Sequence, residues 1–270
     1  MVIEKTLQKL EELINFPCSD DYFDLRIKRY LINFVFRGLK DSNYKLSSSL
    51  YRNTGTNRIN VEDRILLNFR KYAQILEPRV LNSIWETMIL AQHHGAPTRL
   101  LDWTYSPLIA LHFAIENADT LNGTSKDAAI WALDHNKMNN SLPKQYTDIL
   151  KRQNGISYTF EMLQELELTI DKYNDDMNNK HLLFFEPPAI DERVVNQYSV
   201  FSIMPDSLDP YDDYLYSSED EIIAFKFIIP KDKLYHFADQ LDILNISERT
   251  LFPGLDGIAS WLRRRYFHRT

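Results

Sequence analysis

Hydrophobic residues recur every three or four positions in two N-terminal segments, and this spacing predicts amphipathic helices. In residues 2–15 the apolar face is formed by Ile3, Leu7, Leu10 and Ile14. Pro17 ends this first segment. The second segment spans residues 61–88 and is interrupted by Pro78, so we expect either two helices or one kinked helix there.

Continuous apolar runs rich in β-branched and aromatic residues predict strands in the rest of the chain. The predicted strands are residues 30–36, 128–134, 181–188, 193–203 and 221–230. Ser106-Pro107 combines an N-cap residue with a first-turn proline, which predicts a buried helix over residues 107–117. Further helices are predicted over residues 231–244 and 254–267. Because helices and strands do not alternate regularly, we expect an α+β fold, with a mixed or antiparallel sheet flanked by helices.

Three polar segments separate these elements. Residues 41–57 form a predicted loop, and residues 205–221 form an acidic loop. Residues 135–180 are rich in Asn, Asp and Lys, with one helical patch near residues 158–170. We interpret residues 135–180 as an insertion with a mobile tip. No internal repeat is present, and we expect a single domain over residues 1–270.

Composition and charge narrow the class of protein. Hydrophobic residues make up 44% of the chain, enough for a large core. The net charge of −7 argues against a broad nucleic-acid surface, which needs a basic face, but it leaves room for a local basic pocket. Cys18 is the single cysteine, so no disulfide forms within the chain, and we interpret it as a small apolar residue. Without a signal peptide or an 18-residue apolar run, we expect a cytoplasmic protein with no membrane partner.

The chain has seven glycines, and four of them fall in three short segments. They are Gly38, Gly95, Gly254 and Gly257. Gly95 sits where the left-handed residue after a helix belongs. Gly38 follows Arg37 at the end of a predicted core strand, and glycine lets another molecule approach the backbone closely. A bare peptide offers a donor and an acceptor, and a guanidinium binds phosphate in a fork, so Arg37-Gly38 is a candidate ligand clamp.

The segment QHHGAPTRLLDWT, residues 92–104, concentrates polar side chains between two predicted helices. A structural interpretation pairs Arg99 with Asp102 or with another carboxylate to hold the helix crossing. We favour a structural role for Asp102. His93 and His94 fit a structural and a functional role equally well.

Four segments of the chain resemble the FRG-domain family. They are FRGL (36–39), QHHGAPTRLLDWTYSPLIALHFA (92–114), ERVVNQYSVFSI (192–203) and TLFPGLDGIASWL (250–262). The resemblance spans residues 36–262, and the length of the second segment makes it specific. The family is named for the FRG tripeptide rather than for an activity.

The last of these segments is more typical of packing than of chemistry. Pro253 and Gly254 turn the chain, and Asp256 caps the helix that follows. The side chains expected to face the core are Ile258, Trp261 and Leu262, and a solvated helix end is expected at residues 263–265.

The order of the motifs is also similar to that of the ADP-ribosyltransferase superfamily. This resemblance implies that Gly38 holds the nicotinamide amide of NAD and that Arg37 approaches the phosphate or ribose. Thr104 precedes a helix that contains Ala110 and Phe113, and it matches the second motif of the superfamily loosely.

The third motif of that superfamily supplies a glutamate, and here the chain departs from the pattern. Glu192 precedes the predicted strand at 193–203, and Gln197 lies within it on the same face as Arg193. Other candidates for the carboxylate are Glu186 and Glu221. Because this carboxylate stabilises the ribosyl oxocarbenium ion, its uncertain place also fits a protein that binds without turnover.

The superfamily resemblance implies an enzyme that cleaves NAD at the nicotinamide ribosyl bond and passes ADP-ribose to a macromolecule or to water. The implied catalytic residues are Arg37, His94, Thr104, Glu192 and Gln197. The residues implied to bind NAD, as substrate, are Arg37, Gly38, His93, Arg99 and Arg193. No metal is expected.

Two alternatives stay open on the sequence alone. The first is a regulatory module that binds a nucleotide or another anion without turnover. The second is a metal-independent nuclease or phosphodiesterase built on His93, His94 and Arg99, which the acidic charge disfavours. Small intracellular catalytic domains are associated with microbial effectors, toxins and phage defence, although a fold alone does not establish such a role.

Overall fold

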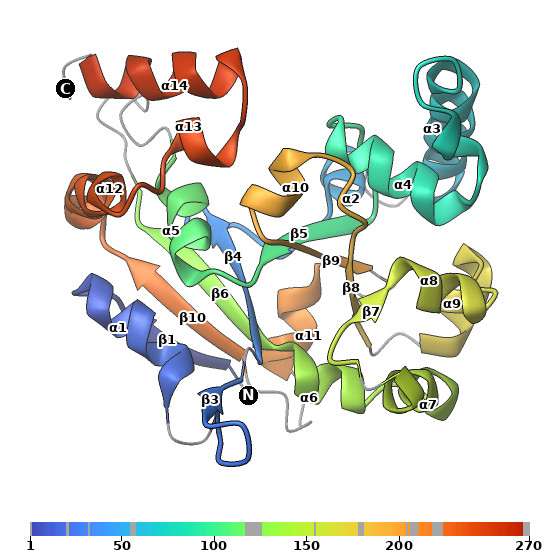
Figure 1. Ribbon diagram of the computed structural model, residues 1–270, viewed down its shortest axis with the longest axis horizontal. Helices are drawn as coiled ribbons and strands as arrows, with labels where there is room; N and C mark the ends of the chain where they lie inside the picture. Colours follow the sequence, from blue (N-terminus) through green and yellow to red (C-terminus); the bar gives the residue numbers. More distant parts are fainter. Residues whose placement is uncertain are drawn as a thin grey trace.

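The computed structural model describes residues 2–19, 22–31, 33–54, 58–116, 126–153, 155–177, 181–203, 205, 210–217 and 224–266. These residues form an α+β fold, which confirms the predicted class (Figure 1). Eight strands make one mixed, mainly antiparallel sheet, flanked by helices. Two short strands, β2 (Phe23–Asp24) and β3 (Arg29–Tyr30), form a separate hairpin.

The large sheet divides into two halves. Its order is β1 (Val2–Thr6), β10 (Ala224–Ile229), β6 (Ala128–Asp134), β4 (Phe34–Leu39), β5 (Leu100–Thr104), β9 (Ser199–Ile203), β8 (Leu183–Glu186) and β7 (Tyr158–Thr159). Strand β4 pairs with β6 along its whole length, from Phe34 to Leu39. It pairs with β5 at one position, Phe36 opposite Thr104. The edge of β4 beyond Phe36 therefore separates from β5.

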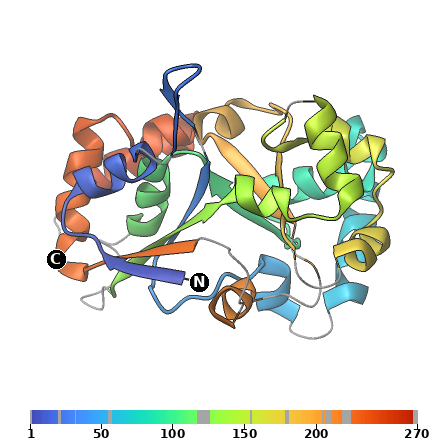
Figure 2. The same ribbon diagram turned by 90° about the horizontal axis from the view of Figure 1, so that it is seen from below.

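Helices α1 (Leu10–Asn15), α5 (Pro107–Ile115) and α12 (Leu234–Ile243) cover the first half of the sheet (Figure 2). Phe34 and Phe36 of β4 and Ala110 and Ala114 of α5 belong to the core that these helices bury. Helix α5 confirms the predicted start, because the Ser106 hydroxyl accepts the N–H of Ile109. This half places the FRG tripeptide directly under α5.

The second half of the sheet packs against α3 (Arg58–Ala73), α4 (Ile84–His93), α7 (Lys144–Gln153), α8 (Phe160–Glu165) and α9 (Ile170–Met177). The predicted helical segment at residues 61–88 is two helices, separated by a 3-10 turn at Pro78–Leu81. Gly95 follows α4 with φ of +83°, as predicted for a left-handed end residue.

The prediction of one helical patch within residues 135–180 is wrong. This stretch contains α6 (His135–Asn140), β7 and helices α7 to α9. Tyr146, Leu163 and Tyr173 are fully buried in the core of the second half. Polar residues dominate the composition because each short helix needs only a narrow apolar face.

The prediction of one helix over residues 2–15 is also wrong. Residues 2–6 form β1, which pairs in parallel with β10, and only Leu10–Asn15 is helical. A spacing of four residues fits the period of a strand as well as that of a helix, so Ile3 and Leu7 did not distinguish the two. Pairing with the edge of β10 decides the outcome.

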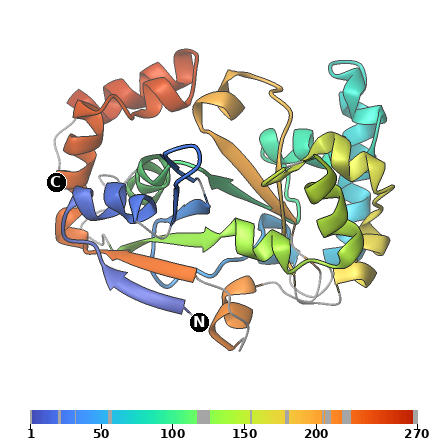
Figure 3. The same cartoon turned by 60° about the horizontal axis from the view of Figure 1, so that its bottom comes forward.

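Residues 193–203 begin as a helix rather than a strand. Asp191 caps α10 (Glu192–Asn196) by accepting the N–H of Val194 at 3.0 Å, and β9 starts only at Ser199. Both predicted loops contain short helices, α2 (Ser49–Thr54) and α11 (Tyr211–Ser217). Figure 3 shows α10 and β9 between the two groups of helices.

The C-terminal helix differs from its predicted packing. After α13 (Glu248–Leu251), helix α14 (Leu255–Tyr266) buries Gly257, while Ile258 and Leu262 are each 40% exposed. A Cβ on Gly257 would lie 1.9 Å from the carbonyl oxygen of Phe252, so the helix approaches through its backbone. Arg264 is not solvated, because it donates to the carboxylates of Asp242 and Glu248.

Candidate functional site

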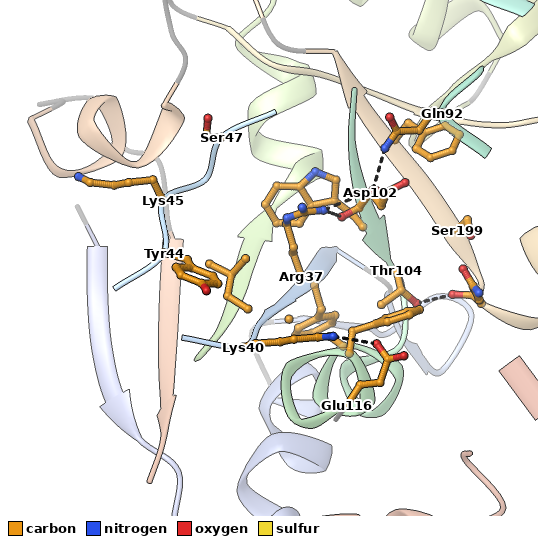
Figure 4. A pocket seen from close by; sticks show the side chains of 18 of the residues that line it. Arg37, Lys40, Tyr44, Lys45, Ser47, Gln92, Asp102, Thr104, Glu116 and Ser199 are labelled. Atoms are coloured by element: carbon orange, nitrogen blue, oxygen red, sulfur yellow. Dashed lines mark hydrogen bonds and ion pairs between the residues drawn. The ribbon is translucent and has the colours of Figure 1, made fainter. Parts of the chain in front are cut away.

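A cavity of about 1280 Å³ lies where β4 separates from β5. Its walls come from β4, β5, β9, α2, α4, α5 and α10 and from residues 43–47 and 210–213. Typical small-molecule pockets measure about 300–1,000 Å³, so this cavity has room for a ligand as large as a dinucleotide. Figure 4 shows Arg37 in the middle of the cavity, between Lys40 and Asp102.

Gly38 lines this cavity, but its missing side chain has a second explanation. A Cβ on Gly38 would lie 2.1 Å from the carbonyl oxygen of Ala110 and 2.6 Å from the nitrogen of Ala114. Any side chain would therefore collide with the backbone of α5. Glycine is required here for the packing of helix on strand, while its backbone remains part of the cavity wall.

Arg37 points to the other face of β4, where its guanidinium is incompletely satisfied. One terminal nitrogen donates to the backbone carbonyl of Asp102, and the carboxylate of Asp102 lies 3.7 Å away. The Nε–H is buried without a partner among the described residues, and the side chain is 16% exposed. Burial lowers the pKa of Arg37, but an arginine stays protonated in proteins. The cavity wall thus carries a fixed positive charge with unused donors.

Further basic side chains surround Arg37. Lys40 pairs with Glu116 at 3.3 Å, and Lys45 pairs with Asp213 at 2.6 Å. The Arg52 guanidinium donates to the carbonyl of Ser47 and lies close enough to Arg37 to lower the pKa of that residue further. Within the described residues Arg52 forms no ion pair, so Arg37 and Arg52 together favour an anionic ligand.

Thr104 and Gln197 meet at another part of the cavity wall. The Thr104 hydroxyl donates to the backbone carbonyl of Gln197 at 2.8 Å and accepts the N–H of Ser106. The side-chain amide of Gln197 donates to the carbonyl of Leu251 at 3.1 Å. Both residues line the cavity. Their polar atoms join β5 to the end of α10, which fixes the shape of this wall.

His93 and Arg193 complete the group of predicted residues that converge. His93 Nε2 lies 2.5 Å from the Asp191 carboxylate, which also caps α10. Burial lowers the pKa of His93 and outweighs the opposite effect of Asp191. The Arg193 guanidinium lies 5.1 Å from the centre of the Phe252 ring. Arg37, Gly38, Thr104 and Gln197 belong to the same cavity lining.

Three predicted residues lie outside the cavity lining. His94 is exposed and packs its ring against that of His93. Arg99 is buried and donates to Glu62, so its structural interpretation holds, with Glu62 rather than Asp102 as partner. Glu192 is exposed on α10. The set proposed for a nuclease, His93, His94 and Arg99, is therefore not assembled at one site.

Of the two other candidate carboxylates, the one that the structure describes lies elsewhere. Glu186 accepts from the hydroxyl of Tyr105 at 2.8 Å and lines a second cavity. Glu221 lies outside the described residues.

Sequence reasoning missed several residues of the cavity. Asp102, interpreted as structural, lines it with a side chain 57% exposed, and Gln92 donates to its carboxylate at 2.9 Å. Lys40 and Glu116 lie just past the ends of β4 and α5 and meet only in the folded chain. Arg52 was hidden in a predicted loop, because a six-residue helix is too short to show a hydrophobic period.

Among the described residues, no group of three or more His, Cys, Asp or Glu side chains is arranged to hold a metal ion. None of the helices in the described ranges is long and apolar enough to span a membrane.

Comparison with known proteins identifies one part of the chain. No curated protein and no solved structure matches it. The family model described as FRG domain matches residues 32–123, which run from β4 past α5 and include both the FRGL and the QHHGAPTRLLDWT segments. The similar segments at residues 192–203 and 250–262 lie beyond the match. The chain therefore contains an FRG domain, at residues 32–123.

Proposed function

We propose that the cavity beside β4 binds NAD and that the protein cleaves its nicotinamide ribosyl bond, in the manner of an ADP-ribosyltransferase or an NAD glycohydrolase. The observation that carries the proposal is the incomplete hydrogen bonding of the Arg37 guanidinium. Its guanidinium is held at the wall of a dinucleotide-sized cavity, with a buried Nε–H that has no partner in the described chain. A buried donor left unpaired costs free energy that a phosphate oxygen of a ligand would recover.

The arrangement suggests a division of roles along the cavity. Arg37 and Arg52 contact the pyrophosphate, because neither guanidinium has a close carboxylate bond among the described residues and the two repel each other until an anion binds. The edge of β4 that has separated from β5 offers backbone donors and acceptors to the nicotinamide amide. Thr104 and Gln197 hold the wall between these regions rather than contact the ribose, since their polar atoms already bond to the protein.

Asp102 is the carboxylate best placed for the chemistry. It lies beside Arg37, and more than half of its side chain is exposed. Glu116, the carboxylate at the end of α5, is already paired with Lys40. As the bond from ribose C1 to the pyridinium nitrogen breaks, nicotinamide leaves with the bonding electrons and positive charge develops on the ribose. Asp102 stabilises that charge, and water or an acceptor group adds to C1 and releases a proton.

Binding without turnover is the second candidate function. It is favoured by the positions of Glu192 and Glu186, the carboxylates expected from the superfamily resemblance, which lie outside this cavity. A protein that retains Arg37 but lacks an effective carboxylate would hold the nucleotide intact. The two candidates differ in one product, free nicotinamide.

The test is an incubation of the purified chain with NAD, followed by chromatographic measurement of nicotinamide. We expect release that falls by roughly 100-fold in Asp102→Asn, the scale of loss on removing one electrostatic group from a catalytic site. Arg29→Lys, on the exposed β3 of the hairpin, is the matched control and should leave the rate unchanged. No release, together with stabilisation of the protein by NAD, supports binding alone. If NAD neither releases nicotinamide nor stabilises the protein, both candidates are rejected.

A further inference from the structure

A second cavity, of about 380 Å³, lies on the other side of α10 from the first. The two cavities share Val194 and Ser199 as wall residues. Arg193 and Gln197 belong to the first cavity, whereas Val195 and Tyr198 belong to the second. Figure 1 shows α10 above β9. The segment from α10 to β9 thus forms a partition between two spaces.

The charged group of the second cavity is a carboxylate. Among the described residues that line it there is no lysine or arginine, and Glu186 is the carboxylate. The Tyr105 hydroxyl donates to Glu186 Oε1 at 2.8 Å, and the hydroxyl of Ser157 lies 2.6 Å from that of Tyr105. Glu186 Oε2 has no hydrogen-bond partner within the described chain. The cavity therefore offers one free carboxylate oxygen.

His135 adds a neutral ring to the wall. Its Nδ1 lies 2.7 Å from the carbonyl oxygen of Asn33, which places the proton on Nδ1 and makes Nε2 an acceptor. Nε2 is buried and has no partner among the described residues. Burial lowers the pKa of His135 to about 4, so the ring carries no charge at pH 7. Glu186 and His135 both present acceptors and no donors.

Tyr198 reaches this cavity at the cost of backbone strain. It follows the last turn of α10 with φ of +51°, a conformation that glycine or asparagine adopts easily and that a bulky residue rarely adopts. Its carbonyl accepts the N–H of Tyr105, and the two rings meet edge to face, with centroids 5.2 Å apart. Strain of this kind clusters at ligand-binding sites, and here the Tyr198 side chain lines the cavity.

We propose that this second cavity binds a small organic cation that carries a guanidinium group. A carboxylate oxygen, an acceptor ring and two tyrosine rings suit a cation and repel an anion. A guanidinium is planar, stacks on aromatic rings and has donors that point in several directions. The volume has room for a group the size of an arginine side chain, and the carboxylate of Glu186 disfavours an anionic nucleotide. The protein therefore has an anion site and a cation site on the two sides of α10.

The test compares two probes of the same shape, N-butylguanidinium and the uncharged N-butylurea, by calorimetric titration of the full chain without nucleotide. We expect N-butylguanidinium to bind at least about tenfold more tightly. Glu186→Gln, which still accepts from Tyr105, should remove that preference. Glu161→Gln, an exposed glutamate on α8 outside both cavities, should keep it. Equal affinity for the two probes, no binding of either, or full preference in Glu186→Gln would overturn the proposal.

Tyr198→Asn separates a binding role from a structural one. Asparagine tolerates the positive φ, so the variant should melt at the same temperature as the parent or higher while its affinity for N-butylguanidinium falls. A lower melting temperature with unchanged affinity would show that the ring serves packing and would also overturn the proposal. Because no nucleotide is present, the result does not depend on what the first cavity binds.

Discussion

Arg99 and Arg37 lie in two regions of the molecule. The two side chains differ in how completely their nitrogen atoms are hydrogen-bonded to the protein. Arg99, 3% exposed, donates through Nε and a terminal nitrogen to Glu62, itself buried, and through its other terminal nitrogen to Asn174. This cluster joins β5 to α3 and α9. Arg37 instead has a backbone carbonyl as acceptor, a carboxylate at 3.7 Å and an Nε–H with no partner among the described residues.

The difference separates an arginine that completes the fold from one that is left for a ligand. Both residues occur in motifs that the sequence singled out, so the sequence does not distinguish the buried Arg99 from the partly buried Arg37. The distinction lies in the hydrogen bonds. A closed cluster has no donor to offer, whereas Arg37 has donors at the wall of a cavity that Arg52 also lines.

The largest effect should come from opening the closed cluster. Glu62→Ala leaves the buried Arg99 without its carboxylate and should lower the free energy of unfolding by about 3–5 kcal/mol, measured by urea denaturation. Asp148→Ala, which breaks the exposed pair of Lys144 and Asp148 on α7, is the control and should have a much smaller effect. If Glu62→Ala lowers the free energy of unfolding only slightly, the pairing of Arg99 with Glu62 does not stabilise the fold as we infer.

A second effect tests the packing face of β4, opposite Arg37. Gly38→Ala forces a methyl group against the backbone of α5 and should cost about 1–3 kcal/mol in the free energy of unfolding. In the control Gly155→Ala the nearest atom is the flexible methyl of Met162 at 3.1 Å, so the cost should be smaller.

The outcome also decides why position 38 is glycine. If Gly38→Ala folds as stably as the parent but no longer binds ADP-ribose, the glycine serves the ligand and not the helix.

Sequence patterns were sufficient for a correct prediction where all the residues that determine a feature lie in one short segment. Ser106-Pro107 defines the start of α5, and the FRGL and QHHGAPTRLLDWT segments lie within the residues that match the FRG domain. They failed where a distant partner decides the structure. Residues 2–6 are a strand because β10 pairs with them, and α10 is a helix because Asp191 caps it.

The candidate site was also predictable only where neighbouring residues in the sequence determine it. Arg37 and Gly38 adjoin in sequence and both reach the cavity. Arg99 shares a motif with Asp102 but faces α3, because Glu62 lies there. Arg52 joins the cavity from a segment with no recognisable motif. Which donors remain unpaired depends on contacts between residues far apart in the chain, and no local pattern contains that information.

The smallest effect should be a pH dependence of ligand binding. Burial lowers the pKa of His93 below its usual value near 6.5, so the ring is neutral at pH 7 and adds no charge to the cavity. Affinity for ADP-ribose should therefore be constant from pH 8 to 7 and rise by a few-fold only as the pH falls below about 6.5, when protonation adds a positive charge.

His93→Gln should remove this rise, as followed by calorimetry across the pH range. A rise between pH 8 and 7 that depends on His93 would show instead that Asp191 holds the ring protonated.

The most direct test of the account is a calorimetric titration of ADP-ribose into the parent chain and into Arg37→Lys. A lysine keeps the positive charge but not the fork of donors, so we predict that the parent binds and that the variant binds at least about tenfold more weakly. Its free energy of unfolding should stay within about 1 kcal/mol of the parent value, because no close ion pair is lost. Equal affinity in the two proteins, or no binding by the parent, would contradict the assignment of Arg37 to a ligand.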